Sequence, residues 1–260
     1  MECALELSPK RRVLITGAGQ RLGKAMAEAL GSEGYGVAIH YHSSSEGAEQ
    51  AARNIRAAGG QAELIQADLS DELQLDTLIE RAADALGGKI GILINNASAF
   101  HDDDASSHTR ENWDMHMNVN LRAPVKLSQM LSQHLNADER GLIINMIDQR
   151  VWKLNPKFFT YTLSKSALWS ATKTLAQALA PNIRVNGIGP GPTLQGERQS
   201  EDDFQKQIEA TLTQRGANPD EIVRAVRFLI DADAVTGQMI AVDGGQHLVW
   251  QTPDVVDIIE

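Results

Sequence analysis

The chain has 260 residues, of which 42% are hydrophobic and 22% are charged, and its formal net charge at pH 7 is −10. This composition is typical of a globular protein with a sizeable core, and the negative charge argues against a nucleic-acid groove or an anionic membrane surface as the main partner. The only cysteine, Cys3, excludes an internal disulfide framework, and the first twelve residues hold no signal-peptide core, so we expect a soluble cytoplasmic protein without nucleic-acid or membrane partners.

β-rich runs and helical patterns alternate along the whole chain. The predicted strands are residues 13–16, 36–41, 62–67, 90–95, 142–147, 183–188 and 238–242. The predicted helices are residues 21–32, 46–58, 72–86, 110–135, 158–179, 201–213 and 219–230. This alternation indicates βαβ units with right-handed crossovers. We therefore predict an α/β protein: a single-domain, doubly wound Rossmann fold over residues 1–260, with a parallel seven-stranded sheet, helices on both faces and a flexible N-terminus at residues 1–11.

The first predicted strand leads into a glycine-rich turn, "TGAGQRLG", at residues 16–23. Glycines allow the backbone to approach a pyrophosphate, and the helix that follows directs N–H groups and its positive dipole end at the phosphates. A helix-initiating turn without a ligand is the alternative, but a strand before the turn and a helix after it favour dinucleotide binding. The predicted cofactor contacts in the turn are Gly17, Gln20, Arg21, Leu22 and Gly23. Arg21 replaces an expected glycine, and its guanidinium would point at a phosphate or an electron-rich ring.

The end of the second predicted strand indicates which cofactor binds. An acid at this point would bind a ribose 2′-hydroxyl and repel a 2′-phosphate. The segment "HYHSSS" at residues 40–45 contains no acid before Glu46, and its hydroxyl, N–H and imidazole groups suit a phosphate. We therefore predict NADPH/NADP as the cofactor, with contacts from His42, Ser43 and Ser44. A polar loop in which Ser45 caps the next helix explains the same residues.

No metal site is predicted. His40 and His42 alternate on a strand, and "HDDD" occupies residues 101–104, but no third compact group of ligands accompanies them. Acidic loops of this kind are usually solvated, so we expect no metal.

A Tyr-x-x-x-Lys pair, Tyr161 and Lys165, lies in the predicted helix 158–179. Side chains four residues apart share a helix face, and a nearby ammonium lowers the pKa of a phenol, so we expect Tyr161 to exchange protons near neutral pH. The pair alone would fit a surface helix. Its occurrence with the glycine turn, "NNAS" at residues 95–98, Asn120 and "RVNGIGPGPT" at residues 184–193 makes chance a poor explanation.

Together these motifs resemble those of the short-chain dehydrogenase/reductase family over essentially the whole chain. They occur in the family's order, with "ADLSD" around Asp68 and a closing "TGQMIAVDGG" at residues 236–245. The resemblance implies a homotetramer, a small-molecule substrate and a substrate loop at residues 193–204. It also implies further cofactor contacts from Asp68, Leu69, Asn95, Ala97, Tyr161, Lys165, Pro190, Gly191 and Thr193.

Three departures from the common family pattern resemble the pteridine reductase branch, which includes dihydromonapterin reductases. Arg21 replaces the middle glycine of the turn, and Phe100 follows "NNASA". Asp148 stands 13 residues before Tyr161, where a serine is expected. The combination is more specific than any one departure, because a lone Asp148 would also fit a carboxylate that caps a neighbouring turn.

The branch resemblance implies NADPH-dependent reduction of a dihydropterin to a tetrahydropterin, with dihydrofolate or oxidised pterin as other candidate substrates. Tyr161 would supply a proton that Asp148 holds or relays, provided that an apolar pocket raises the pKa of that carboxyl. Phe100 would stack on the heterocycle and Ser98 would bind its polar edge. The predicted catalytic residues are Asp148, Tyr161, Lys165 and Asn120, and the predicted substrate contacts are Arg21, Ser98, Phe100, Asp148 and Tyr161. A carbonyl reductase of the same family and a non-catalytic nucleotide sensor remain the alternatives.

Overall fold

The computed structural model describes residues 11–196, 198–252 and 255–256. Seven parallel strands form one sheet in the order β3-β2-β1-β4-β5-β6-β7. The strands are β1 (Arg12–Ile15), β2 (Gly36–Tyr41), β3 (Gln61–Gln66), β4 (Ile92–Asn95), β5 (Gly141–Met146), β6 (Ile183–Pro190) and β7 (Met239–Val242). The predicted single-domain Rossmann fold is confirmed. Cys3 and residues 1–10 of the predicted N-terminal segment lie outside the described residues.

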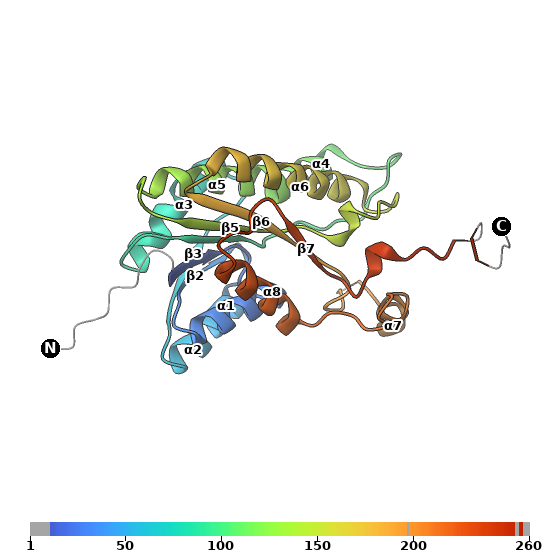
Figure 1. The fold of residues 1–260 in the computed structure, drawn as a ribbon, viewed down its shortest axis with the longest axis horizontal. Coiled ribbons are helices and arrows are strands. Elements are labelled where there is room, and N and C mark those ends of the chain that lie inside the picture. The colour runs from blue at the N-terminus through green and yellow to red at the C-terminus, as the bar shows by residue number, and fades with distance from the viewer. Residues whose placement is uncertain (1–10, 197, 253–254, 257–260) are drawn as a thin grey trace.

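Helices cover both faces of the sheet (Figure 1). One layer contains α1 (Arg21–Ser32), α2 (Ser45–Ala57) and α8 (Pro219–Asp231). The opposite layer contains α3 (Glu72–Ala85), α5 (Ala123–His134) and α6 (Phe159–Leu179), and α4 (Arg110–Met117) packs beside α6. The short α7 (Glu201–Glu209) stands apart from both layers in Figure 1. No helix among the described residues is long and apolar enough to cross a membrane.

The central strands contain apolar runs, Val13–Ile15 in β1 and Ile92–Ile94 in β4, because both of their faces are covered. In β1, Val13 and Ile15 face the α1–α2–α8 layer, whereas Leu14 between them faces the α3–α5–α6 layer, and all three are fully buried. β4 repeats the arrangement, with Leu93 pointing to the second layer. This two-sided core holds the carboxyl ends of the strands at one edge, where ligands bind in such folds.

The single helix predicted at residues 110–135 is wrong in one respect. A π-helical turn, Asn118–Arg122, separates α4 from α5. An apolar pattern continues through such a turn, so the sequence does not reveal the extra residue, although π turns are frequent at functional sites. Asn120 lies inside this turn and is fully buried.

Candidate active site

A cleft of about 1670 Å³ lies at the carboxyl edge of the sheet. Nearly all the predicted site residues line it: Gly17, Gln20, Arg21, Leu22, Gly23, His42, Ser43, Ser44, Asp68, Leu69, Ala97, Ser98, Phe100, Asp148, Tyr161, Lys165, Pro190, Gly191 and Thr193. A smaller cavity of about 390 Å³, between Gly91, Pro181 and Asp233, contains none of them. The large cleft is therefore the candidate active site.

Asn95 and Asn120 do not line the cleft. The amide of Asn95 is buried and donates to Asn145 Oδ1 at 2.8 Å, while the next residue, Asn96, lines the cleft instead. Asn120 accepts the N–H of Ala99 at 2.7 Å and donates to the carbonyl of Ala99 at 2.9 Å. Asn120 thus holds the loop that carries Ser98 and Phe100, and its predicted role in catalysis stays a prediction.

The glycine turn and the loop after β4 form one floor of the cleft. Gly17 has a φ of 63°, and a Cβ atom there would lie 2.9 Å from Ala97 Cα, so a side chain does not fit. Thr16 Oγ1 accepts the N–H groups of Asn96 at 2.9 Å and Ala97 at 3.0 Å, which joins the two loops. No side chain caps the N-terminus of α1 at Gln20, which suits N–H groups that are to bind a phosphate. This cradle fits the pyrophosphate of a dinucleotide.

His40 lines the cleft, although it is not among the predicted cofactor contacts. Its ring is buried; Nδ1 accepts the N–H of Gly17 at 3.0 Å and Nε2 lies 3.1 Å from the carbonyl oxygen of Ala67. These partners require a neutral ring with its proton on Nε2. Burial lowers the pKa of His40 to about 4, in agreement with this state. His40 therefore connects the glycine turn to the end of β3, just before Asp68. Among the described residues no group of three or more His, Cys, Asp or Glu side chains could hold a metal ion.

Asp148, Tyr161 and Lys165 meet at the base of the cleft. The hydroxyl of Tyr161 donates to Asp148 Oδ2 at 2.9 Å, and Asp148 Oδ1 accepts the N–H of Arg150 at 2.8 Å, where a short 3₁₀ turn begins. Lys165 Nζ donates to the carbonyl of Met146 at 2.8 Å and lies 5.8 Å from the centre of the Tyr161 ring. The carboxylate that replaces the expected serine is therefore a direct partner of the phenol.

The electrostatics of this group differ from the prediction. Burial, followed by the charge of Asp148 and the hydrogen bond to it, raises the pKa of Tyr161 well above its usual value. Burial lowers the pKa of Lys165 to about 8, and the charge of Asp148 opposes this shift. The expected lowering of the Tyr161 pKa by Lys165 is wrong here, because the phenol is buried and in contact with the Asp148 carboxylate, whereas the ammonium of Lys165 is held by a carbonyl. Tyr161 consequently keeps its proton at neutral pH.

Phe100 belongs to an aromatic cluster on one side of the cleft. Its ring stacks on that of Phe158, with 4.3 Å between centroids and 12° between planes, and meets the ring of Tyr161 edge-on at 4.7 Å. The guanidinium of Arg198 lies over the Phe100 ring, 5.7 Å from its centre. Phe100 remains 42% exposed, so a flat molecule could stack on the part of its ring that Phe158 and Arg198 leave uncovered. Neither Phe158 nor Arg198 is among the predicted site residues, although Arg198 lies in the predicted substrate loop.

Arg21 contacts the predicted substrate loop. Its guanidinium donates to the carbonyl of Leu194 at 3.0 Å and that of Gln195 at 2.9 Å, and its φ of 52° lies in a region that L-residues seldom adopt. From the same loop, Arg198 donates to the carbonyl of Phe100 at 2.7 Å. The loop is thus fastened to the glycine turn and to the aromatic cluster. The predicted contacts of Arg21 with phosphate or substrate stay predictions.

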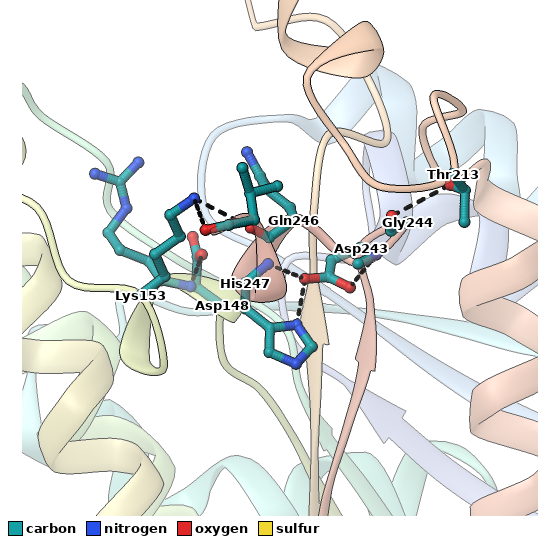
Figure 2. A network of polar contacts seen from close by, with 10 residues as sticks. Asp148, Lys153, Thr213, Asp243, Gly244, Gln246 and His247 are labelled. Carbon is teal, nitrogen blue, oxygen red and sulfur yellow. Dashed lines mark hydrogen bonds and ion pairs between the residues drawn. The ribbon is translucent and has the colours of Figure 1, made fainter. Parts of the chain in front are cut away.

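A polar network lies next to the end of β7 (Figure 2). The buried carboxylate of Asp243 accepts the N–H of Gly245 at 2.9 Å and, from His247, the backbone N–H at 2.9 Å and ring Nδ1–H at 2.7 Å. Lys153, which follows the 3₁₀ turn after Asp148, donates to the carbonyl of Val249 at 3.2 Å. The segment after Asp148 is thereby tied to the C-terminal segment.

The chain is similar over most of its length to known oxidoreductases and reductases. The family model described as "Enoyl-(Acyl carrier protein) reductase" matches residues 17–247. An uncharacterized oxidoreductase of Methylorubrum extorquens is 34% identical over 89% of this chain and 96% of its own length. The crystal structure of FolM alternative dihydrofolate reductase 1 from Brucella suis, in complex with NADP, is 48% identical, with a TM-score of 0.92 over 96% of this chain and 100% of that chain. The angucycline C-6 ketoreductase LanV with bound NADP is 31% identical, with a TM-score of 0.85 over 92% of this chain and 96% of that chain.

Proposed function

Because the chain belongs to the short-chain dehydrogenase/reductase family and is an NADP-dependent oxidoreductase, we propose that it reduces a pteridine with NADPH. The substrate would be a dihydropterin that becomes a tetrahydropterin, with dihydrofolate or oxidised pterin as other candidates. The observation that carries the proposal is the hydrogen bond from the Tyr161 hydroxyl to the Asp148 carboxylate, 2.9 Å long, inside the cleft. The similarity to a dihydrofolate reductase of Brucella suis supports the same class of substrate.

The chain provides groups of the right chemistry for each part of the cofactor. The Gly17 turn and the start of α1 would hold the pyrophosphate, and the segment His42–Ser44 would bind the 2′-phosphate. Asp68, which accepts hydrogen bonds from both the N–H and the hydroxyl of Ser70, would lie beside the adenine. Bound NADPH would supply the hydride.

Reduction of a C=N bond requires a proton at nitrogen as well as the hydride. Tyr161 would donate this proton, because its raised pKa keeps the phenol protonated at neutral pH. Asp148 would orient the phenol and relay a replacement proton to it. The ammonium of Lys165 would balance the negative charge that develops on the phenol as the proton leaves. Phe100 would form the wall on which the flat ring stacks.

Asp148 offers the sharpest test of the proposal. NADPH oxidation would be followed with dihydrobiopterin, dihydromonapterin, dihydrofolate and a panel of simple ketones. Asp148→Ser keeps a hydrogen-bonding group but cannot carry a proton near neutral pH, and Asp148→Asn keeps the shape but does not titrate. We expect both variants to lose most of their kcat for pteridines while the Kd for NADPH stays within about twofold of the parent, as for an interaction made in the transition state.

Two results would contradict the proposal. Parental rates of pteridine reduction by Asp148→Ser would remove Asp148 from the proton relay. A parent enzyme that reduces ketones but no pteridine would favour the second candidate function, carbonyl reduction, which the similarity to the ketoreductase LanV supports.

We also propose that the protein is a homotetramer, as the family resemblance implies. Leu248 and Trp250 in the C-terminal segment are 59% and 58% exposed, and large apolar side chains at a surface are often covered by a partner. Light scattering at micromolar concentrations would test this, and a monomeric mass would contradict it.

A further inference from the structure

A buried polar network adjoins the aromatic cluster of the cleft, and none of its members is among the predicted site residues, although Asp103 also lines the cleft. It consists of Asp103 from the loop after β4, His116 from α4 and Thr160 from the first turn of α6. Asp103 is 8% exposed, and His116 and Thr160 are fully buried. Buried polar groups of this kind are costly unless each has a partner, so their partners define what the network does.

Asp103 caps α6 from outside the helix. Its Oδ1 accepts the N–H of Thr160 at 3.0 Å, its Oδ2 accepts the hydroxyl of Thr160, and its backbone carbonyl accepts the N–H of Phe159 at 3.2 Å. A carboxylate at this point satisfies N–H groups that a helix leaves unpaired and interacts favourably with the helix dipole. The helix residue that Asp103 holds comes immediately before Tyr161.

Thr160 is also linked to a second residue of this loop, His101, through the ring of His116. Thr160 gives its one hydroxyl proton to Asp103, so its oxygen accepts Nδ1–H of His116 at 2.7 Å. The other ring nitrogen of His116, Nε2, accepts the N–H of His101 at 3.0 Å. This arrangement requires a neutral His116, and burial lowers its pKa. Thr160 is the central member, because it is the residue that contacts both of the others.

The network joins the loop that carries Phe100 to the helix that carries Tyr161. Phe100 directly precedes His101, whose N–H is held by His116, and Tyr161 directly follows Thr160. The Phe100 and Tyr161 rings meet edge-on with 4.7 Å between centroids. Without the hydroxyl of Thr160, the contacts to Asp103 Oδ2 and His116 would be lost. The backbone N–H contacts with Asp103 and the Asn120 contacts would then be left to hold the loop with Phe100 against the helix with Tyr161.

We propose that Thr160 is a positioning residue for the reduction: its hydroxyl group fixes the Phe100 ring relative to the Tyr161 hydroxyl, and thereby the position of the stacking wall relative to the proton donor. Thr160 does not line the cleft, so it acts through its neighbours rather than on the substrate. That the flat substrate is a pteridine rests on the proposed function. The arrangement of Phe100 and Tyr161 does not depend on it.

A pair of substitutions isolates the hydroxyl. Thr160→Val keeps the shape and removes the hydroxyl group, and Thr160→Ser restores it without the methyl group. Thr172→Val is the matched control, because Thr172 is also buried in α6 and its hydroxyl also has two partners, the carbonyl of Leu168 at 2.8 Å and the amide of Asn145 at 2.9 Å. KM, kcat, the Kd for NADPH and the unfolding midpoint would be measured for each variant with dihydrobiopterin.

We expect Thr160→Val to raise KM about tenfold or more and to lower kcat, since a misplaced wall and proton donor both impair the reaction. The Kd for NADPH should stay within about twofold, and Thr160→Ser should lie within about threefold of the parent in kcat/KM. Thr172→Val should lower the unfolding midpoint without this change in KM. Asp103→Asn should reproduce the Thr160→Val pattern, because its amide N–H₂ group would face the hydroxyl of Thr160, which donates a hydrogen bond to Asp103 in the parent. This variant provides the test if Thr160→Val does not fold.

Equal KM values for Thr160→Val, Thr172→Val and the parent would overturn the inference, as would a Thr160→Ser variant as impaired as Thr160→Val. If the parent reduces a ketone and no pteridine, the proposed function fails, and the same series with that ketone decides the role of Thr160 by the same criteria. A parent that reduces none of the compounds overturns both.

Discussion

Acidification should destabilise the protein through His40. In the folded chain its Nδ1 accepts the N–H of Gly17, so a second proton on the ring breaks that hydrogen bond. Burial lowers the pKa of His40 from 6.5 to about 4. Between these values the unfolded chain binds more protons than the folded chain, so the stabilisation is present above pH 6.5 and is lost as the pH falls towards 4. A shift of about 2.5 units at about 1.36 kcal/mol per unit predicts a loss of about 3 kcal/mol by pH 4.

Urea unfolding between pH 7 and pH 4, followed by tryptophan fluorescence, would measure this loss. Carboxylates titrate in the same range, so the informative quantity is the difference between the parent and His40→Gln, whose amide does not titrate. His42→Gln is the matched control, because the His42 side chain is 63% exposed. The parent should lose about 3 kcal/mol more than His40→Gln, and His42→Gln should behave like the parent. Equal losses in the parent and His40→Gln would refute the reasoning.

Three further predictions concern the cleft. Tyr161→Phe removes only the hydroxyl group, so it should bind NADPH normally but lose about 10²–10⁴-fold in kcat; a loss of a few-fold would mean that another group donates the proton. Because residues 42–45 contain no acid, NADPH should support a much higher kcat/KM than NADH in steady-state assays, and equal values would contradict that assignment. Arg21→Gly removes the hydrogen bonds to Leu194 and Gln195, and glycine adopts a φ of 52° without strain. The loop should then open more often, so trypsin should cleave after Arg198 several-fold faster than in the parent. An unchanged cleavage rate would show that Arg21 does not hold the loop.

The sheet was predictable because its pattern is local. Each central strand is a short apolar run bounded by turn residues, and the runs alternate with amphipathic helices, which leaves few topologies. Residues 21–32 and 36–41 form α1 and β2 with the predicted bounds. The π-helical turn at Asn118–Arg122 was not predictable, because one extra residue in a helical turn does not visibly change the spacing of apolar residues along the predicted helix.

The site was predictable where a residue follows directly from a strand or a motif. Gly17 and Asp148 line the cleft because they follow β1 and β5 and the carboxyl ends of parallel strands share one edge, and Tyr161 was identified by its spacing to Lys165. Contacts between distant segments, such as that of Arg198 with Phe100, depend on loop conformations that no local pattern encodes. His40 did carry a signal: a polar residue at a fully buried strand position requires internal partners.

The two arginine contacts with the substrate loop have a kinetic consequence. Hydrogen bonds with charged donors fasten the loop to both the glycine turn, through Arg21, and the aromatic cluster, through Arg198. A product enclosed by this loop leaves only after such contacts break, and in many enzymes loop opening of this kind is slower than the chemical step. Turnover would then depend on loop opening, and replacing the transferred hydride with deuteride would barely slow the steady state while slowing a single turnover.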